Sequence, residues 1–158
     1  MTFENIVLVI AGTLTALLAG LFFGYAVSVV PAFKRLKDAE YVRAMQAINI
    51  AILNPVFFVS FMGPLVLLPF SAFLAWDNDS TARFWLLVCA SAVYIVGTFG
   101  ITAAGNVPLN EKLAKAEGSE KELSAARAAF ETSWNYLHNL RTFAAIAATI
   151  LVFAACLR

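Results

Sequence analysis

Apolar residues dominate four long stretches of the chain, and charged residues are confined to the segments between them. No charged side chain interrupts residues 5–33, 44–76 or 84–110, and a shorter uncharged run covers residues 142–157. A membrane-spanning helix needs roughly 20 largely apolar residues, so the first three runs are long enough to cross a bilayer. The pattern predicts an all-α integral membrane four-helix bundle that forms a single domain over residues 1–158, with helices at about 5–33, 44–76, 83–110 and 119–157.

The fourth helix is predicted to begin well before its apolar run and to extend into the cytoplasm. The run at 142–157 is too short to span a bilayer, so the polar segment before it must contribute, which draws Arg141 to the membrane boundary or just inside it. Ser119 and Glu122 form a capping-box pattern that marks the helix start. Apolar side chains then recur at helical spacing from Leu123 onward.

Lys and Arg residues predict how the chain is oriented in the membrane. The connections at 34–43 and 111–131, together with Arg141, hold nine Lys and Arg residues, whereas the opposite side holds only Arg83 and Arg158. Because positively charged connections stay in the cytoplasm, we expect both connections there and both termini on the non-cytoplasmic side. The short segment 77–80 is expected to be a tight turn on the outer face.

Composition supports a membrane protein and narrows its partners. Charged residues make up 13% of the chain and the net charge is +1, whereas soluble proteins average about 25% charged residues. Nothing therefore points to nucleic acid as a partner, and membrane lipids are expected around the helices. Cys89 and Cys156 lie in apolar runs without a CxxC spacing, so we interpret them as small core residues. The first apolar run lacks a basic start and is too long for a signal peptide, so we expect it to be a helix of the mature protein.

Small residues and prolines predict where helices approach one another and where they bend. Gly20 and Gly24 form a GxxxG spacing, which allows close helix packing within the bundle or against a second copy in a homo-oligomer. Gly97 and Gly100 are expected to serve helix packing too. A residue before proline resists the α-helical conformation, so bends or helix boundaries are expected at the prolines 31, 55 and 108.

Polar side chains converge at one end of the predicted bundle. Trp134, His138 and Arg141 share one face of the fourth helix, because they lie four and seven residues apart. His138 is the only histidine of the chain. The third helix ends, and the second begins, on the side where the fourth helix enters. The further polar residues at that end are Asn106 and Asn110 on the third helix, Asn135 on the fourth, and Gln46, Asn49 and Asn54 on the second. We interpret this set as a small-molecule site.

Each of these residues also has an ordinary structural role. Asparagines cap helix ends, tryptophan lies at membrane interfaces, and arginine extends toward lipid headgroups. For His138, a role as ligand or base and a hydrogen-bonded structural role are both open. One histidine without nearby Cys, Asp or Glu cannot supply a zinc or di-iron ligand set, so no metal site is predicted. No GxGxxG or P-loop pattern indicates a nucleotide cofactor.

The polar motifs resemble those of a known family. Asn106-x-Pro108-x-Asn110 followed by Trp134-Asn135-x-x-His138-x-x-Arg141, in a four-helix membrane protein, resembles the DUF1772 or anthrone oxygenase-like family. Pro31-Ala32-Phe33, Met45–Asn49 and Asn54-Pro55 are similar to that family's first connection and second helix, so the resemblance covers nearly the whole chain.

The resemblance implies a cofactor-free oxygenase, since characterised fungal relatives convert anthrones to anthraquinones with O₂ and without a metal or flavin. In that reaction His138, with an ordinary pKa near 6.5, would be the general base. Asn106, Asn110 or Arg141 would stabilise the developing oxyanion. Trp134 would stack on the flat substrate. Asn135, Gln46, Asn49 and Asn54 would complete the binding site for an anthrone-like aromatic or another small hydrophobic molecule.

Two alternatives belong to other functional classes. The first is a non-catalytic membrane module whose polar end binds a lipid, a quinone or a partner protein. The second is a haem-binding membrane protein that uses His138 as its single axial ligand. The actual substrate is not indicated by the sequence.

Overall fold

The computed structural model describes residues 2–76 and 81–158, and this part of the chain consists of helices joined by short connections, without any strand. The elements, with η for π-helical segments, are α1 (Phe3–Gly24), η1 (Tyr25–Val29), α2 (Val30–Phe33), α3 (Asp38–Ala51), α4 (Pro55–Leu74), α5 (Thr81–Ala92), η2 (Val93–Gly100), η3 (Thr102–Asn106), α6 (Val107–Ala114) and α7 (Glu120–Cys156). The predicted turn at 77–80 lies outside the described residues.

Four helical rods are long and apolar enough to cross a membrane: Phe3–Phe33, Pro55–Leu74, Thr81–Ala114 and Glu120–Cys156. Their outward faces carry large exposed apolar side chains along the whole bundle. Such faces would be unfavourable in water and are suited to lipid. The chain is therefore a multi-pass integral membrane protein with an all-α four-helix fold, as predicted.

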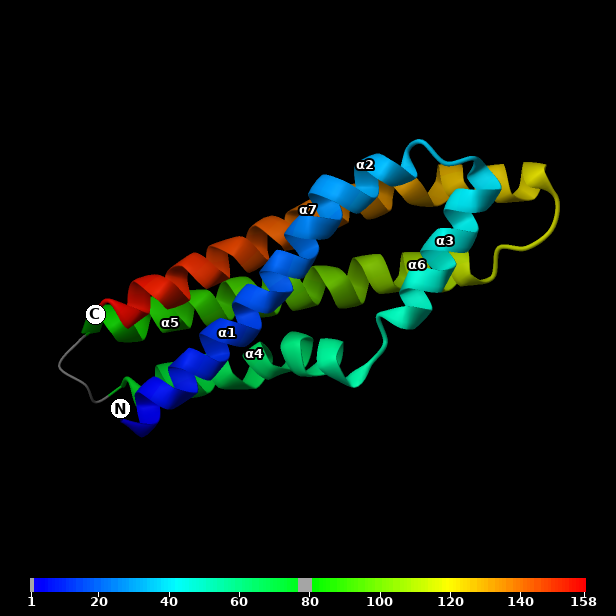
Figure 1. Ribbon diagram of the computed structural model, residues 1–158. Coiled ribbons are helices and arrows are strands. Elements are labelled where there is room, and N and C mark those ends of the chain that lie inside the picture. Colours follow the sequence, from blue (N-terminus) through cyan, green and yellow to red (C-terminus); the bar gives the residue numbers. More distant parts are fainter. Residues whose placement is uncertain (1, 77–80) are drawn as a thin grey trace.

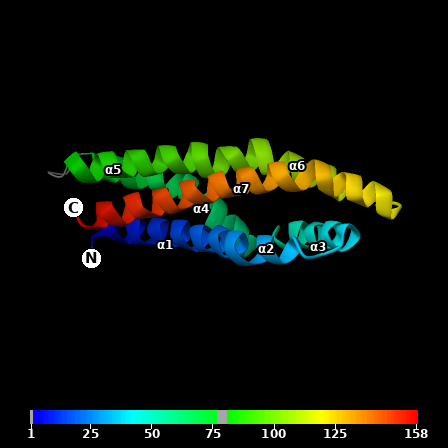
Figure 2. The ribbon, with the colours of Figure 1, turned by 90° about the horizontal axis from the view of Figure 1, so that it is seen from above.

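The four rods form a closed ring of neighbours. α1 packs against α4, α4 against α5, α5 against α7, and α7 against α1 (Figure 1). Figure 2 shows α7 lying between α5 and α1. Alanines fill much of the interface, including Ala11 of α1, Ala90 of α5 and Ala145 of α7. Small side chains let helix backbones approach closely, which is how helices associate in lipid, where burial of apolar area gives little advantage.

The second predicted helix is wrong in its boundaries, because the run at 44–76 is broken. α3 starts earlier, at Asp38, ends at Ala51, and lies at a steep angle to the long rods (Figure 1). α4 begins at Pro55, with Asn54 as its N-cap; the Asn54 side-chain oxygen accepts a hydrogen bond from the Phe57 N–H at 3.0 Å. Asn54 is extended, as a residue before proline prefers. The break places α3 across one end of the bundle.

The long fourth helix begins where the sequence predicts. Ser119 and Glu122 form the expected capping box: the Ser119 side chain accepts from the Glu122 N–H, and the Glu122 carboxylate accepts from the Ser119 N–H at 2.7 Å. α7 then runs unbroken to Cys156. Its extension into the cytoplasm remains a prediction.

An arginine ties α3 to α7. The Arg127 side chain on α7 donates to the Leu36 carbonyl at 2.8 Å, to Asp38 at 3.0 Å and to Glu131 at 2.7 Å. It also lies over the Tyr41 ring, 4.4 Å from its centroid. Hydrogen bonds from Ser124 and then Arg127 lower the pKa of Asp38. A lowered pKa means that the stabilisation is complete above the ordinary aspartate pKa and is lost as the pH falls through the lowered value.

Of the prolines 31, 55 and 108, the first and the last lie inside continuous rods, as Pro64 and Pro69 do within α4. Pro31 and Pro108 each follow a π-helical segment, η1 and η3 respectively, and the helix resumes at once. Only Pro55 starts a new rod. π-helical turns are rare and frequently occur at functional sites, and both of these segments contribute residues to the cavity described below.

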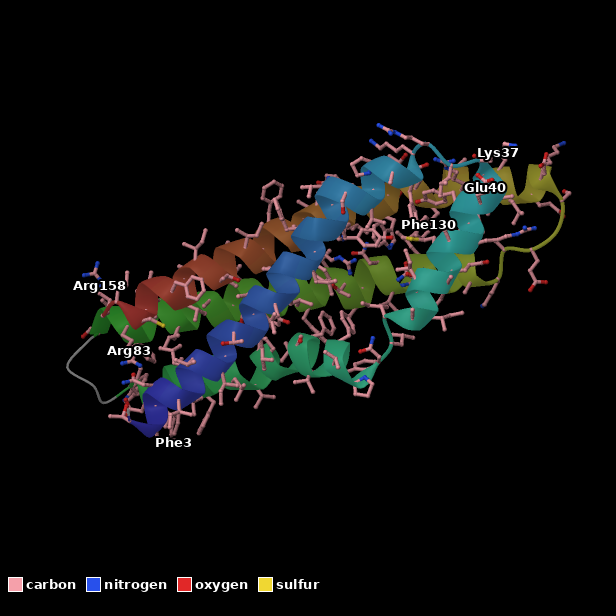
Figure 3. All side chains as sticks on the ribbon, viewed as in Figure 1. Phe3, Lys37, Glu40, Arg83, Phe130 and Arg158 are labelled. Atoms are coloured by element: carbon pink, nitrogen blue, oxygen red, sulfur yellow. The ribbon has the colours of Figure 1, made fainter. Side chains whose placement is uncertain are left out.

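The two ends of the bundle differ. Both termini lie at one end, which we call the terminal end, and α3 lies at the other, the α3 end (Figure 1). Figure 3 shows Lys37 and Glu40 at the α3 end and Arg83 and Arg158 at the terminal end. Which end faces the cytoplasm remains a prediction from the charge distribution.

Two expectations about small side chains fail. Cys89 and Cys156 are exposed on the outside of the bundle and are not core residues, because the outer face of a membrane helix accepts small apolar side chains as readily as the core does. Gly20 and Gly24 have no atoms within 4 Å of where a Cβ would lie, leaving out their own helix backbone and sequence neighbours, so they serve no helix contact within the described chain. Homo-oligomerisation through them remains untested.

Gly97, in contrast, sits in a tight helix contact, and substitution there should destabilise the protein. A Cβ at Gly97 would lie 2.6 Å from the Cβ of Ala144 on α7. Neither atom can move without shifting its helix, so Gly97→Ala is expected to cost about 1–3 kcal/mol, as overpacking does. Thermal unfolding in detergent would show this as a lower Tm. The matched control Gly20→Ala should leave the Tm unchanged or slightly raised, and adding Ala144→Gly to Gly97→Ala should restore it. Equal Tm values for the two single variants would contradict this packing.

Candidate functional site

His138 lies on the inner face of α7 and is 1% exposed. Its Nδ1 accepts hydrogen bonds from Arg141, at 3.2 Å from Nε and 3.1 Å from Nη2. Its Nε2 lies 3.2 Å from the Phe22 carbonyl oxygen of α1. Because a guanidinium has only donors, Nδ1 must carry the lone pair, and Nε2 must carry the hydrogen and donate it to Phe22. His138 is thus held as one neutral tautomer with both nitrogens engaged.

Arg141 is a buried cation whose partners are all uncharged. Besides His138, it donates from Nη1 to the Thr102 hydroxyl of η3 at 3.3 Å. Its guanidinium carbon lies 4.3 Å from the ring centroid of Phe22 and 5.3 Å from that of Trp134. Arg141 forms no ion pair with any residue of 2–76 and 81–158, unlike Arg127, which pairs with Asp38 and Glu131. An unpaired cation inside a membrane bundle is costly, and such residues mark functional sites.

Trp134 forms an aromatic wall beside this pair. Its ring stacks on His138 with centroids 4.8 Å apart and planes inclined by 13°. The indole N–H donates to Asn110 of α6 at 2.7 Å, and the Trp134 carbonyl accepts from the Asn106 amide at 3.2 Å. These bonds hold Trp134 in place. Its ring also stacks on Phe130, with centroids 5.8 Å apart, and only 3% of the residue is exposed, so little of its aromatic surface is open to a ligand.

A cavity of about 510 Å³, which we call the central cavity, is lined by His138, Arg141 and Trp134 together with the residues given below. This volume is within the range of about 300–1,000 Å³ for small-molecule sites. Most of its lining is apolar, with a few polar groups, as such sites usually show. The lining residues are Leu21, Phe22, Tyr25, Gln46, Ile48, Asn49, Ile50, Ile52, Leu53, Phe57, Phe58, Phe61, Thr102, Val107, Asn110, Glu111, Ala114, Trp134, His138 and Arg141.

The structure brings some of the candidate residues together and assigns others to the fold. Trp134, His138, Arg141, Asn110 and Asn49 all line the central cavity. Gln46 lines it too, but the Gln46 amide donates to the carbonyls of Leu113 and Ala116 at 2.9 and 3.0 Å, so it caps the end of α6.

Three asparagines lie outside the cavity lining. Asn54 is the N-cap of α4. Asn106 is fully buried behind Trp134; its Nδ2 is bonded, and its Oδ1 has no hydrogen-bond partner in the described part of the chain. Asn135 borders a narrow cleft beside Tyr25 and Met45. None of the three can touch a ligand in the central cavity as it stands.

Sequence reasoning missed three residues of the site, namely Phe22, Tyr25 and Thr102. Phe22 acts through its backbone carbonyl, which no side-chain pattern reveals. Tyr25 lies on η1, where its ring packs against Trp134 and His138 with centroids 5.5 and 5.3 Å away. The only signal in the sequence is that Tyr25 is a polar aromatic within an apolar helix near Pro31.

The hydrogen bonds of His138 argue against haem binding. An axial bond to haem iron would need one of the His138 ring nitrogens, and both are engaged in hydrogen bonds, so the geometry disfavours the haem alternative. Among the residues that the structure describes, no group of three or more His, Cys, Asp or Glu side chains lies close enough to hold a metal ion.

Comparison with known proteins shows the family of the chain. No curated protein and no solved structure matches the chain. A family model described as anthrone oxygenase matches residues 57–151, more than half of the 158 residues. The matched region includes Asn106, Asn110, Trp134, His138 and Arg141, and excludes α1 and α3. The chain therefore belongs to the anthrone oxygenase family.

Proposed function

We propose that this protein is a membrane-embedded oxygenase that uses O₂ to convert an anthrone-like aromatic ketone to a quinone, without a cofactor. The observation that carries the proposal is the buried pair of Arg141 and His138, which lines a largely apolar cavity and has no acidic partner among the described residues. Such a pair can stabilise an oxyanion and accept a proton at one place, which is what the reaction requires.

Substrate binding would use the positive charge of Arg141 and the aromatic side chain of Trp134. The carbonyl oxygen of the ketone accepts hydrogen bonds from the Arg141 guanidinium, whose fork presents several donors. The flat ring system lies in the part of the central cavity that Trp134 borders, and the hydrogen bond to Asn110 holds Trp134 in place there. The apolar remainder of the central cavity accommodates the hydrocarbon edges and dissolves O₂.

Proton transfer would follow from the competition for Arg141. In the structure the Nδ1 lone pair of His138 is occupied by the two N–H groups of Arg141. When the substrate oxygen takes these donors, Nδ1 becomes free to remove a proton from the methylene carbon, which lies across the central ring from the ketone and is conjugated with it through the flanking rings. The product is an enolate whose oxygen faces the guanidinium. The Phe22 carbonyl keeps the ring in place through the Nε2–H and stabilises the imidazolium.

Oxygen insertion then consumes one O₂ per substrate. The electron-rich enolate transfers an electron to O₂, and the resulting radical pair forms a carbon–oxygen bond to give a peroxide anion. Protonated His138 returns its proton to the peroxide. Loss of the second methylene hydrogen and cleavage of the O–O bond give the quinone carbonyl and water. The methylene carbon is oxidised by four electrons, and O₂ is reduced by four.

A second candidate is a non-catalytic module that binds a quinone or another flat aromatic ligand. The engagement of both His138 nitrogens favours it, because a histidine bonded on both sides suits a fixed binding wall as well as a base. The two candidates differ in whether the protein turns the ligand over.

Isotope labelling tests the proposed function directly. Purified protein supplied with anthrone and ¹⁸O₂ is expected to form anthraquinone carrying one ¹⁸O atom, with one O₂ consumed per quinone, faster than in protein-free detergent. Mass spectrometry of the quinone and an oxygen electrode measure both quantities. Quinone formation no faster than the protein-free rate would reject catalysis and leave the binding module.

A further inference from the structure

Asn49 is the one polar residue of α3 that lines the central cavity with a buried, unbonded amide group. Its Nδ2 is inaccessible to solvent and has no hydrogen-bond partner among residues 2–76 and 81–158. Gln46, one turn earlier on α3, uses its own amide on two backbone carbonyls. Buried amide donors are nearly always bonded, so a donor without a partner at a cavity wall indicates a position for a ligand acceptor.

α3 holds this amide in a fixed position. Arg127 bonds the start of α3 through Asp38, and Gln46 bonds the middle of α3 to the end of α6. Tyr25 of η1 donates to the Met45 sulfur at 3.0 Å, which adds a contact from a third rod. A donor on an element restrained at several points loses little freedom when it binds, so its hydrogen bond discriminates between ligands.

Asn49 and Arg141 line different parts of the same cavity. Gln46 bonds near Leu113, and Asn110 on the same helix α6 bonds Trp134, so Asn49 lies toward the α3 end of the cavity. Arg141 reaches the cavity from α7, where its guanidinium carbon lies 5.3 Å from the Trp134 ring centroid. A ligand that bonds both Asn49 and Arg141 must therefore carry two separate acceptor groups.

We propose that Asn49 is a specificity-determining residue that donates a hydrogen bond from Nδ2 to a second acceptor oxygen of the aromatic ligand, distinct from the oxygen that Arg141 holds. This inference rests on the proposed function, because it takes the ketone or quinone oxygen to be held by Arg141. The ligand class is therefore a flat polycyclic ketone or quinone that carries a further ether, hydroxyl or carbonyl oxygen.

Two quinones of similar size test the inference by binding alone. 2-Methoxyanthraquinone carries a further acceptor, and 2-ethylanthraquinone replaces it with a methylene group. Quenching of tryptophan fluorescence, with Trp134 as the reporter in the cavity, measures both dissociation constants in detergent. The wild-type protein is expected to bind the methoxy compound about 3- to 10-fold more tightly, as one neutral hydrogen bond provides. Asn49→Leu should abolish that preference, while its binding of the ethyl compound shows that the fold is intact.

Two further variants complete the test. Asn49→Asp presents only acceptors and should also lose the methoxy preference. Asn139→Leu makes the same change at an exposed position of α7 and should keep it. A preference that persists in Asn49→Leu, or no preference in the wild type, would overturn this inference while leaving quinone binding in place. Failure of the wild type to bind either quinone would overturn the proposed function as well.

Discussion

Replacing His138 with alanine is expected to slow O₂ uptake with anthrone by about 10²- to 10⁴-fold, the usual contribution of a positioned general base. The variant loses the only side chain placed to remove the methylene proton next to Arg141. An oxygen electrode measures the rate, corrected for spontaneous oxidation in protein-free detergent. Anthraquinone absorbance provides an independent measurement of the same turnover.

A second variant separates proton transfer from positioning. His138→Gln places an amide that can hydrogen-bond toward Phe22 and Arg141 but cannot accept a proton at neutral pH. If His138 is the base, both variants lose activity to a similar extent. If His138 only orients Arg141, the glutamine variant recovers much of the rate. Asn139→Ala, at an exposed position of the same helix, should oxidise anthrone at the wild-type rate. An unchanged rate in His138→Ala contradicts the mechanism.

Replacing Arg141 with leucine should reduce kcat by about 10²- to 10³-fold, the effect of removing a donor to a developing oxyanion. The enolate would form without a cation beside its oxygen, and the neighbouring Thr102 hydroxyl already donates to the Thr98 carbonyl at 2.6 Å. Arg141→Lys keeps the charge but loses the planar fork that bonds His138 and Thr102 together, so it should recover only part of the rate. Steady-state kinetics with anthrone and O₂ measure kcat and KM for each variant.

A surface arginine provides the control for Arg141. Arg35 lies in the connection after α2, is exposed, and makes no side-chain contact with the central cavity. Arg35→Leu should therefore leave kcat unchanged. Comparable losses in Arg35→Leu and Arg141→Leu would show that the effect comes from general loss of positive charge, and equal kcat in Arg141→Leu and the wild type would remove Arg141 from the mechanism.

The sequence was sufficient to predict the class of fold, the long fourth helix and its shared face. The uncharged runs, the Ser119 cap and the spacing of Trp134, His138 and Arg141 each depend on local rules, and all three hold in the structure. The hydrogen bond between His138 and Arg141 is local as well, since the two residues are one turn apart.

Other features could not be predicted, for identifiable reasons. Both faces of a membrane helix are apolar, so periodicity does not separate the buried from the lipid-facing side, and Cys89 and Cys156 were assigned to the core wrongly. Residue type does not show whether an amide is used on the backbone, so Gln46, Asn49 and Asn54 looked alike although only Asn49 has an unbonded buried donor. The Phe22 carbonyl has no side-chain signal at all.

Arg141 has no acidic partner among the described residues, so the attraction between the site and its ligand changes through the proposed reaction. Arg141 bonds only uncharged groups, and a neutral ketone adds no charge beside it. Proton transfer then places an enolate oxygen beside Arg141 and a positive charge on His138, so the reactive intermediate lies between two cations and is held most tightly when it must be protected from water. The quinone is neutral again, and its affinity falls as soon as oxidation is complete. Electrostatics alone would therefore retain the intermediate and release the product, without any moving segment.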